Sequence, residues 1–236
     1  MKIETKKLIT FLKQLRMGEI NTCLFKFEDD GLHISTNSAA QSHASYAFIK
    51  KEAFIEYSAI GNVGIDELGC LVDKVLKKFN KELDFTVEGN MFTVTSKEKS
   101  VGFELLDEKF VADTKDMPDL EYATTFKIPI SDMFSFVDDI KANKDVILTF
   151  ETVEGGVMLS NTGKYKYKRN INSENTKGGV KCMFASPVIS ALEGILSKDG
   201  KGDLIFHVKT DYPIRIDYVT EDYNISFLIA PWVEKE

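Results

Sequence analysis

The stretch DYPIRIDYVTEDYNISFLIAPWVEKE, residues 211–236, contains two alternating apolar runs separated by a polar turn at residues 220–222. Alternation with a period of two predicts a β-hairpin that buries one face. Pro231 cannot donate a backbone hydrogen bond to a neighbouring strand, so the second strand is expected to end before it. The apolar positions are Ile214, Ile216 and Tyr218 in the first run and Ile225, Phe227 and Ile229 in the second.

The chain leaves this hairpin through an apolar tail, Ala230-Pro231-Trp232-Val233. Chain termini are usually polar and frayed, so an apolar exit needs an explanation. Trp232 and Val233 either cover the body of the domain or border a docking site for a partner. The tail by itself leaves both interpretations open.

Composition indicates a folded protein with an ample core. The 236 residues are enough for one large domain or for two of about 100–120 residues. Hydrophobic residues make up 43% of the chain, with 17 Phe and 8 Tyr, which excludes a disordered chain. The net charge of −7 argues against a generally basic nucleic-acid binder, although a local basic surface is compatible with it.

The three cysteines, Cys23, Cys70 and Cys182, lie in apolar contexts without CxxC spacing. They are expected to be buried free thiols, since neither a metal site nor a disulfide framework fits this spacing. No run approaches 18 apolar residues, and the first residues, MKIETKKLITFLK, are too charged for a signal peptide. A soluble, reducing, intracellular setting is therefore expected.

The first half of the chain predicts a helix, a hairpin, a further strand, a second helix and more paired strands. Residues 4–17 place apolar side chains at helical spacing, and Asp30-Gly31 is a strong turn signal between two strands. The second helix is expected to start near Asp66. Residues 107–123 have no sustained period and contain Met117-Pro118, so they are expected to form an extended linker.

The pattern then starts again at an offset of 125 residues. The alternative to a duplication is that a helix followed by a hairpin recurs by chance. The same offset relates positions in the helix, the turn and the strand, which favours a duplication. We therefore predict an α+β fold with two similar domains, residues 1–106 and 124–236, each with two helices on antiparallel sheet, joined by a connecting loop at residues 107–123. The matching pairs are Leu8 and Met133, Phe11 and Phe136, Leu12 and Val137, Leu15 and Ile140, Phe25 and Phe150, Gly31 and Gly156, Leu32 and Val157, and Ile34 and Leu159.

The sequence contains no recognisable catalytic constellation. His33, His43 and His207 each occur singly in strand-like contexts, which are usually structural. Asp138 and Asp139 are helical neighbours about 100° apart, which suits a solvated face better than an acid–base pair. Glycine-rich phosphate-binding motifs and the GxSxG motif are absent from the sequence. We predict a protein that is not an enzyme and needs no cofactor or metal.

Basic side chains gather on the helix faces opposite the apolar stripes. Lysine on an outer face is usually solubilising, but both helices of the first half carry it in a chain of net charge −7. This segregation of charge suits a surface that contacts a phosphate backbone without reading bases. In the second half, Asp138 and Asp139 weaken the argument. The predicted phosphate-facing residues are Lys6, Lys13, Arg16, Lys74, Lys77, Lys78, Lys141, Lys144 and Lys198.

Three stretches together resemble the sliding clamps of the proliferating cell nuclear antigen (PCNA) family, found in archaea, eukaryotes and some viruses. ISFLIAPWVEKE is similar to the family's last strand, which ends in Leu-Ala-Pro, with Ile229 where Leu is usual and Trp232 where a basic residue is common. Asp211-Tyr212-Pro213 resembles the Pro-containing strand before it. MPDLEY, residues 117–122, is similar to the end of the interdomain connecting loop.

This resemblance implies a ring of three chains, closed head to tail, with helices lining a hole for double-stranded DNA. The implied function is that of a processivity factor, placed on DNA by a clamp loader, that tethers DNA polymerase and other replication and repair enzymes. The pairing edges are expected near residues 101–106 and 165–171. The implied location is the cytoplasm of a prokaryote, or a nucleus or viral replication site.

The resemblance also implies a hydrophobic pocket that binds a short partner peptide with aromatic anchors. Leu228 stands where many members have an aromatic residue, and Gln41 where His is frequent, so peptide preference stays open. A checkpoint-type clamp, a subunit of a hetero-trimer, and a two-domain protein-binding scaffold without DNA contact are the alternative functions. The implied pocket residues are Gln41, Met117, Pro213, Leu228, Ala230, Pro231 and Val233.

Overall fold

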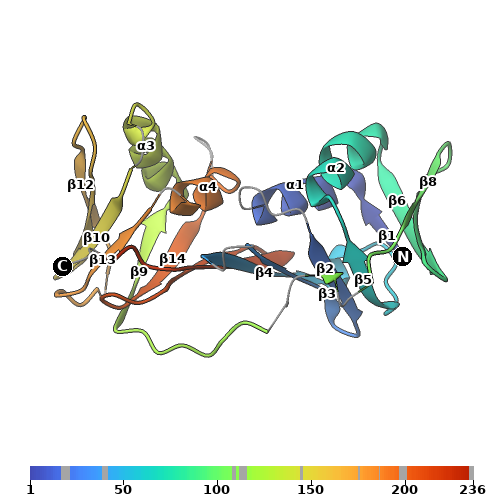
Figure 1. Cartoon of the computed structure of the whole chain (residues 1–236), viewed down its shortest axis with the longest axis horizontal. Helices are drawn as coiled ribbons and strands as arrows, with labels where there is room; N and C mark the ends of the chain where they lie inside the picture. Colours follow the sequence, from blue (N-terminus) through green and yellow to red (C-terminus); the bar gives the residue numbers. More distant parts are fainter. Residues whose placement is uncertain are drawn as a thin grey trace. The chain divides into compact units, whose positions relative to one another are not determined.

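The computed structural model describes two compact units (Figure 1). The first comprises Met1–Pro118 and Val219–Ile225, and the second comprises Asp119–Tyr218 and Ser226–Glu236. In the described part of the chain, no helix is long and apolar enough to cross a membrane. The described residues are 1–16, 22–38, 42–107, 110–111, 116–143, 146–174, 176–185, 187–196 and 201–233.

The first unit contains two antiparallel strand runs, in the orders β1-β6-β7-β8 and β5-β2-β3-β4. The turn before β16 and the first residues of that strand also belong to this unit. The elements are β1 (Lys2–Glu4), α1 (Thr5–Leu15), β2 (Cys23–Glu28), β3 (Gly31–Asn37), β4 (His43–Lys50), the 3-10 turn η1 (Lys51–Ala53), β5 (Gly61–Ile65), a helical run of α2 (Leu68–Cys70), η2 (Leu71–Val75) and η3 (Leu76–Lys78), then β6 (Glu82–Glu88), β7 (Met91–Thr95) and β8 (Ser100–Glu104).

The second unit repeats this plan, with strand orders β9-β14-β15-β16 and β13-β10-β11-β12. Its elements are β9 (Thr124–Pro129), α3 (Ile130–Ile140), β10 (Leu148–Val153), β11 (Gly156–Asn161), β12 (Lys168–Asn172), β13 (Lys181–Phe184), α4 (Pro187–Glu193), β14 (Asp203–Val208), β15 (Ile214–Val219) and β16 (Tyr223–Ile229). Each strand of one unit therefore has a counterpart at the same place in the other.

The duplication extends to the register of strand pairing. Phe25 is paired with Ile34 between β2 and β3, and Phe150 is paired with Leu159 between β10 and β11. Both pairs are separated by the offset of 125 residues that the sequence pattern indicated. The predicted α+β fold, with two helices on antiparallel sheet in each half, is confirmed.

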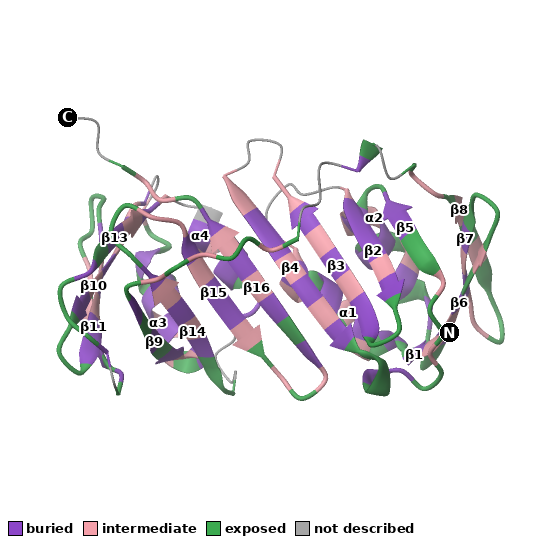
Figure 2. Ribbon diagram, turned by 90° about the horizontal axis from the view of Figure 1, so that it is seen from below, coloured by how far each residue is buried: buried purple, intermediate pink, exposed green. Residues whose placement is uncertain are grey.

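The buried positions follow the periods predicted from the sequence. Along the strands, buried side chains alternate with more exposed ones (Figure 2), so each sheet buries one face. In Figure 1, α1 and the α2 run cover one face of the sheet in their unit, and α3 and α4 do so in theirs. The apolar stripes of both long helices are buried: Leu8, Phe11, Leu12 and Leu15 on α1, and Met133, Phe136, Val137 and Ile140 on α3.

Two boundaries have local physical causes. The strand β16 ends at Ile229, because Pro231 cannot continue a hydrogen-bonded ladder. The second helical run begins at Leu68, not at Asp66, because Glu67 has φ 52°, in the left-handed region outside a right-handed helix.

The cysteines are only in part as expected. Cys23 and Cys182 are buried thiols, and burial raises the pKa of Cys182 to about 12. Cys70 is half-buried, so the prediction of a buried thiol is wrong for this residue. It lies on the side of the helical run that faces β8, where packing is incomplete.

Candidate functional site

The basic residues predicted on the helices of the first unit lie at its surface. Lys6 and Lys13 are exposed on α1, on the side away from the buried stripe. Lys74, Lys77 and Lys78 are exposed on the second helical run. Helical spacing places buried and exposed positions on opposite sides, so both helices present lysines outward.

Asp73 neutralises part of this charge. Its carboxylate lies 2.8 Å from Arg16 Nη1 and 2.8 Å from Lys77 Nζ. The hydrogen bond from Lys77, assisted by that from Arg16, holds the pKa of Asp73 below its usual range. Arg16 and Lys77 therefore contribute less net positive charge to the surface than Lys6, Lys13, Lys74 and Lys78 do.

The helices of the second unit carry a mixed charge. Lys141 is exposed at the end of α3, with its Nζ 3.8 Å from Asp138 Oδ1, while Lys144 and Lys198 lie outside the described residues. Arg169 of β12 reaches α3 and donates to the carbonyl of Asp132, the hydroxyl of Ser135 and the carboxylate of Asp139. Among the described residues, the basic helix surface is thus concentrated in the first unit.

The strands β8 and β12 end their strand runs, each with one neighbouring strand among the described residues. Leu105 N donates to Asn90 O across β7 and β8, and Ser173 N donates to Gly155 O beside β11 and β12. Backbone N–H groups alternate in direction along an antiparallel strand. Those of Glu104 and Asn170 therefore point outward from their sheets, where another strand could accept them.

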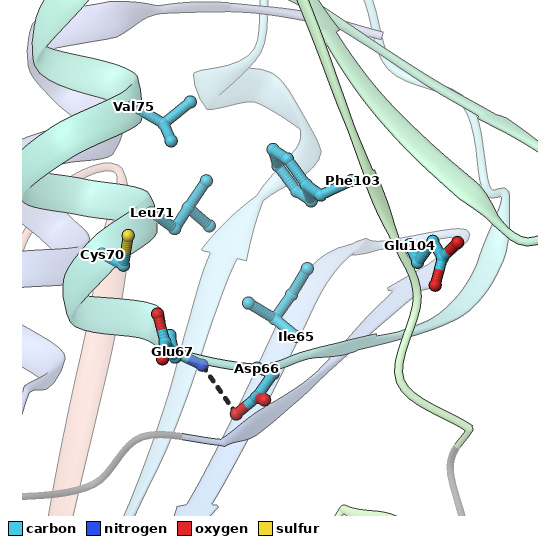
Figure 3. Close-up of a pocket in the computed structure, with 8 residues that line it drawn as sticks. All are labelled: Ile65, Asp66, Glu67, Cys70, Leu71, Val75, Phe103 and Glu104. Atoms are coloured by element: carbon cyan, nitrogen blue, oxygen red, sulfur yellow. Dashed lines mark hydrogen bonds between the residues drawn. The ribbon is translucent and has the colours of Figure 1, made fainter.

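A cavity of about 270 Å³ lies between the α2 run and β8. Figure 3 shows the side chains of Ile65, Leu71, Val75 and Phe103 pointing toward one another across it. Its rim is acidic: Asp66, Glu67 and Glu104 line it together with Cys70. Sequence reasoning missed this cavity, because its walls come from two separate segments, residues 65–75 and residues 103–104, and only the fold brings them together.

The region around β12 has the opposite charge. Lys164, Lys166 and Lys168 are exposed along the approach to this strand and on it. An acidic rim beside one edge strand and a basic segment beside the other are electrostatically complementary between two copies of the chain.

The residues expected to bind a peptide are divided between the units. Met117 is half-buried in the first unit, and Gln41 lies outside the described residues. The others belong to the second unit: Pro213, Leu228 and Pro231 are half-buried, and Ala230 and Val233 are exposed.

The tail is anchored through its backbone. Trp232 N donates to Met183 O at 2.8 Å, which fixes the tail beside β13. Leu228 lies between buried Phe227 and Ile229, so it faces away from the core. Because 57% of Val233 is exposed, the tail does not bury all of its apolar surface.

A polar network occupies the other face of the β9-β14-β15-β16 strands. His207 Nδ1 lies 3.0 Å from Thr125 Oγ1, and its Nε2 lies 3.0 Å from Asp217 Oδ2. Arg215 Nε donates to Asp217 Oδ1 at 2.8 Å. His207 is therefore not isolated, although its sequence context predicted a lone histidine. Strand pairing, which places Thr125 and Arg215 opposite it, supplies the missing neighbours.

Asp217 is a buried carboxylate, with 8% of its surface exposed. Burial by itself would raise its pKa, but hydrogen bonds from His207, Arg215 and Ser226 outweigh that effect and hold the pKa below the usual range. The ring of Tyr122, in the connecting segment, lies 5.6 Å from the ring of His207. The network thus lies under the point where the connecting segment joins the second unit.

Together, the same strand order and a shared register in the two units define a duplicated α+β fold. At the level of sequence, no protein-family model and no curated protein matches the chain.

Two solved structures match over essentially the whole chain. The structure of the C-terminal region of FEN-1 bound to A. fulgidus PCNA has a TM-score of 0.86 and 18% identity, covering 100% of this chain and 98% of that one. PCNA from Entamoeba histolytica has a TM-score of 0.81 and 19% identity, covering 98% of each chain. The chain has the fold of the PCNA sliding clamps, as the resemblance of its sequence implied.

The stability contributed by Asp217 is expected to depend on pH. Because its folded pKa is below the unfolded value of about 3.9, the contribution is fully present above that pH and is lost as pH falls through the folded pKa. Asp217→Asn is expected to lower the free energy of unfolding by about 1–3 kcal/mol at pH 7, because it removes a buried charge-assisted acceptor. Urea unfolding of both proteins between about pH 7 and pH 3 measures this difference. A deficit that stays constant over this range would contradict the assignment.

Proposed function

We propose that this chain is a DNA sliding clamp: a ring-forming, non-enzymatic processivity factor that encircles double-stranded DNA and tethers DNA polymerase and other replication and repair enzymes. The fold shared with PCNA supports a clamp role. The observation that carries the proposal is a strand junction. The chain contains one example, between β4 and the start of β16, and the two halves of an equivalent one.

The first unit contains the beginning of one such junction, because residues 223–225 of β16 belong to it. The start of β16 is the neighbour of β4, and Lys50 N donates to Asp222 O at 3.1 Å. In the duplicated plan, β12 is the counterpart of β4, and β8 is the counterpart of β16. The strands β8 and β12 are thus the two halves of an equivalent junction.

Pairing β8 of one chain with β12 of the next would complete that junction. The outward N–H groups of Glu104 and Asn170 supply donors for the pairing. The acidic rim by β8 and the lysines around β12 favour a head-to-tail contact over contact between like edges. Repetition of one heterologous contact generates a ring when the rotation closes. We propose closure with three chains, as the family resemblance implies.

The basic helices supply the DNA-facing surface of the proposed ring. Exposed lysines on α1 and the α2 run would contact phosphates without reading bases, which suits a protein that slides. Lys141 adds a weaker contribution, because Asp138 lies beside it.

Recruitment of enzymes would use the apolar tail. The A. fulgidus structure contains the C-terminal region of FEN-1, a peptide segment of another protein, bound to that clamp. In this chain, exposed Val233 and Ala230, with Leu228 and Pro213, offer apolar surface for an aromatic-anchored peptide. We assign Met117 to the same peptide-binding surface, because its loop resembles the interdomain connecting loop of the PCNA family.

Ring formation can be tested at the proposed edges. Wild-type protein is expected to have the mass of three chains of 26.6 kDa, or 79.8 kDa, in native mass spectrometry. Glu104→Pro and Asn170→Pro each remove an outward N–H, so both variants are expected at 26.6 kDa. Glu104→Ala and Asn170→Ala keep that N–H and serve as matched controls that remain trimers.

Trimeric proline variants would exclude these two edges. A wild-type monomer that assembles only with a related subunit would indicate the hetero-trimer alternative. A wild-type monomer under all such conditions would exclude the ring and favour the protein-binding scaffold.

The DNA-facing surface is tested by removing four exposed lysines. A variant with Lys6, Lys13, Lys74 and Lys78 changed to Ala is expected to support less clamp-dependent DNA synthesis, with weaker salt sensitivity between about 50 and 200 mM. The control loses the same charge elsewhere, through Ala at exposed Lys51, Lys97, Lys181 and Lys201. Equal synthesis by the two variants at every salt concentration would assign the helix lysines to solubility alone.

The peptide surface is tested with single charge insertions. Val233→Asp and Met117→Asp are each expected to weaken binding of an aromatic-anchored peptide at least about tenfold in fluorescence anisotropy, a loss of about 1.4 kcal/mol. Val219→Asp is the matched control, because Val219 is 59% exposed and Val233 is 57% exposed. If Val233→Asp and Met117→Asp bind like the control while all variants stay trimeric, the peptide binds elsewhere.

A further inference from the structure

The turn between β2 and β3 brings two carboxylates and an imidazole together. Asp30 Oδ1 lies 2.9 Å from His33 Nε2, and Glu28 Oε2 lies 3.8 Å from the same nitrogen. The three ligand atoms all lie within 4.8 Å of one another. This cluster is separate from the helix lysines, the edge strands and the tail used above.

Strand register explains why these groups converge. Glu28 is paired with Gly31, and Lys26 is paired with His33, so Glu28 and His33 are diagonal neighbours on one face of the hairpin. His33 lies between buried Leu32 and Ile34, so its ring faces outward. Asp30 lies in the turn that joins β2 and β3, and its carboxylate supplies the third ligand atom of the cluster.

The cluster is held in place by neighbours outside it. The His33 ring packs against Phe48 of β4, with centroids 4.5 Å apart and planes tilted by 32°. The Tyr57 hydroxyl donates to the Glu28 carbonyl at 2.8 Å, which fixes the end of β2. A histidine restrained in this way loses less conformational entropy when it binds a ligand.

The chemistry of the donor set favours a cation. Glu28 and Asp30 each offer a carboxylate oxygen to the cluster, and His33 offers an imidazole nitrogen. One imidazole nitrogen with two carboxylate oxygens suits borderline metals such as Zn²⁺. In a tetrahedral zinc site, ligand atoms about 2.0–2.2 Å from the metal lie about 3.4 Å from one another. The separations of 2.9 and 3.8 Å to His33 Nε2 bracket that value.

We propose that Glu28, Asp30 and His33 form a binding site for one divalent transition-metal ion, with water in the remaining coordination positions. The ion would bridge the last residue of β2, the turn and β3. Bound metal would therefore restrain the tip of the hairpin.

Isothermal titration of the full chain with ZnCl₂ tests the site. We expect one Zn²⁺ per chain, and a loss of affinity of at least about tenfold in both His33→Ala and Glu28→Gln. His43→Ala removes a half-buried histidine of the neighbouring strand β4 and is expected to bind Zn²⁺ like the wild type. Thermal unfolding without metal checks that each variant is folded.

A second readout separates specific binding from general surface binding. Zn²⁺ is expected to raise the unfolding temperature of wild type and His43→Ala more than that of His33→Ala. Absence of binding up to about 1 mM Zn²⁺ would overturn the proposal, leaving the cluster as a hydrogen-bonded surface group. Binding that survives both His33→Ala and Glu28→Gln unchanged would overturn it as well.

Discussion

The structure depends on two close backbone approaches, one in each unit, at glycines 125 residues apart in the sequence. A Cβ atom on Gly31 would lie 2.1 Å from Ile49 O, and one on Gly156 would lie 2.6 Å from Ile171 O. Neither distance is compatible with a side chain. These glycines allow β3 to approach β4, and β11 to approach β12, at the first residue of β3 and of β11. The close approach fixes the register of strand pairing. The register in turn determines which residues of each strand are buried and which are exposed. A slip of one residue would turn every core side chain outward.

Much of this plan was predictable from the sequence, because burial leaves a periodic signature. The stripe of α1, the turn at Asp30-Gly31 and the repeat at Gly156 are local patterns, and they predicted the duplicated α+β fold. The cavity beside β8 and the partners of His207 were not predictable in this way. They depend on which strands are neighbours, and Thr125 is 82 residues away from His207 in sequence. Periodicity identifies the buried face of a strand and does not identify the strand that pairs with it.

Local ion pairs and hydrogen bonds, more than the net charge of −7, determine where the molecule presents positive charge. Asp73 restrains Arg16 and Lys77 at the basic helix surface, whereas Asp217 is buried and satisfied by His207 and Arg215. The two carboxylates have lowered pKa values for related reasons, since donated hydrogen bonds favour the charged form in both. An acidic protein can therefore present a cationic surface without violating its overall composition.

The first residues of β16 belong to the first unit, and this affects the order in which the two units can fold. Lys7 forms an ion pair with Asp222, and the hydroxyl of Tyr223 donates to the side chain of Gln14, a contact that spans 209 residues. During synthesis, the amino-terminal unit lacks these partners until residue 225 has left the ribosome, although the rest of its chain emerges far earlier. Contacts of such sequence separation form late and slowly, because a long loop must close first. The unit whose synthesis begins first therefore cannot be completed until nearly the whole chain has been made, and its β4 edge remains open to mispairing until then.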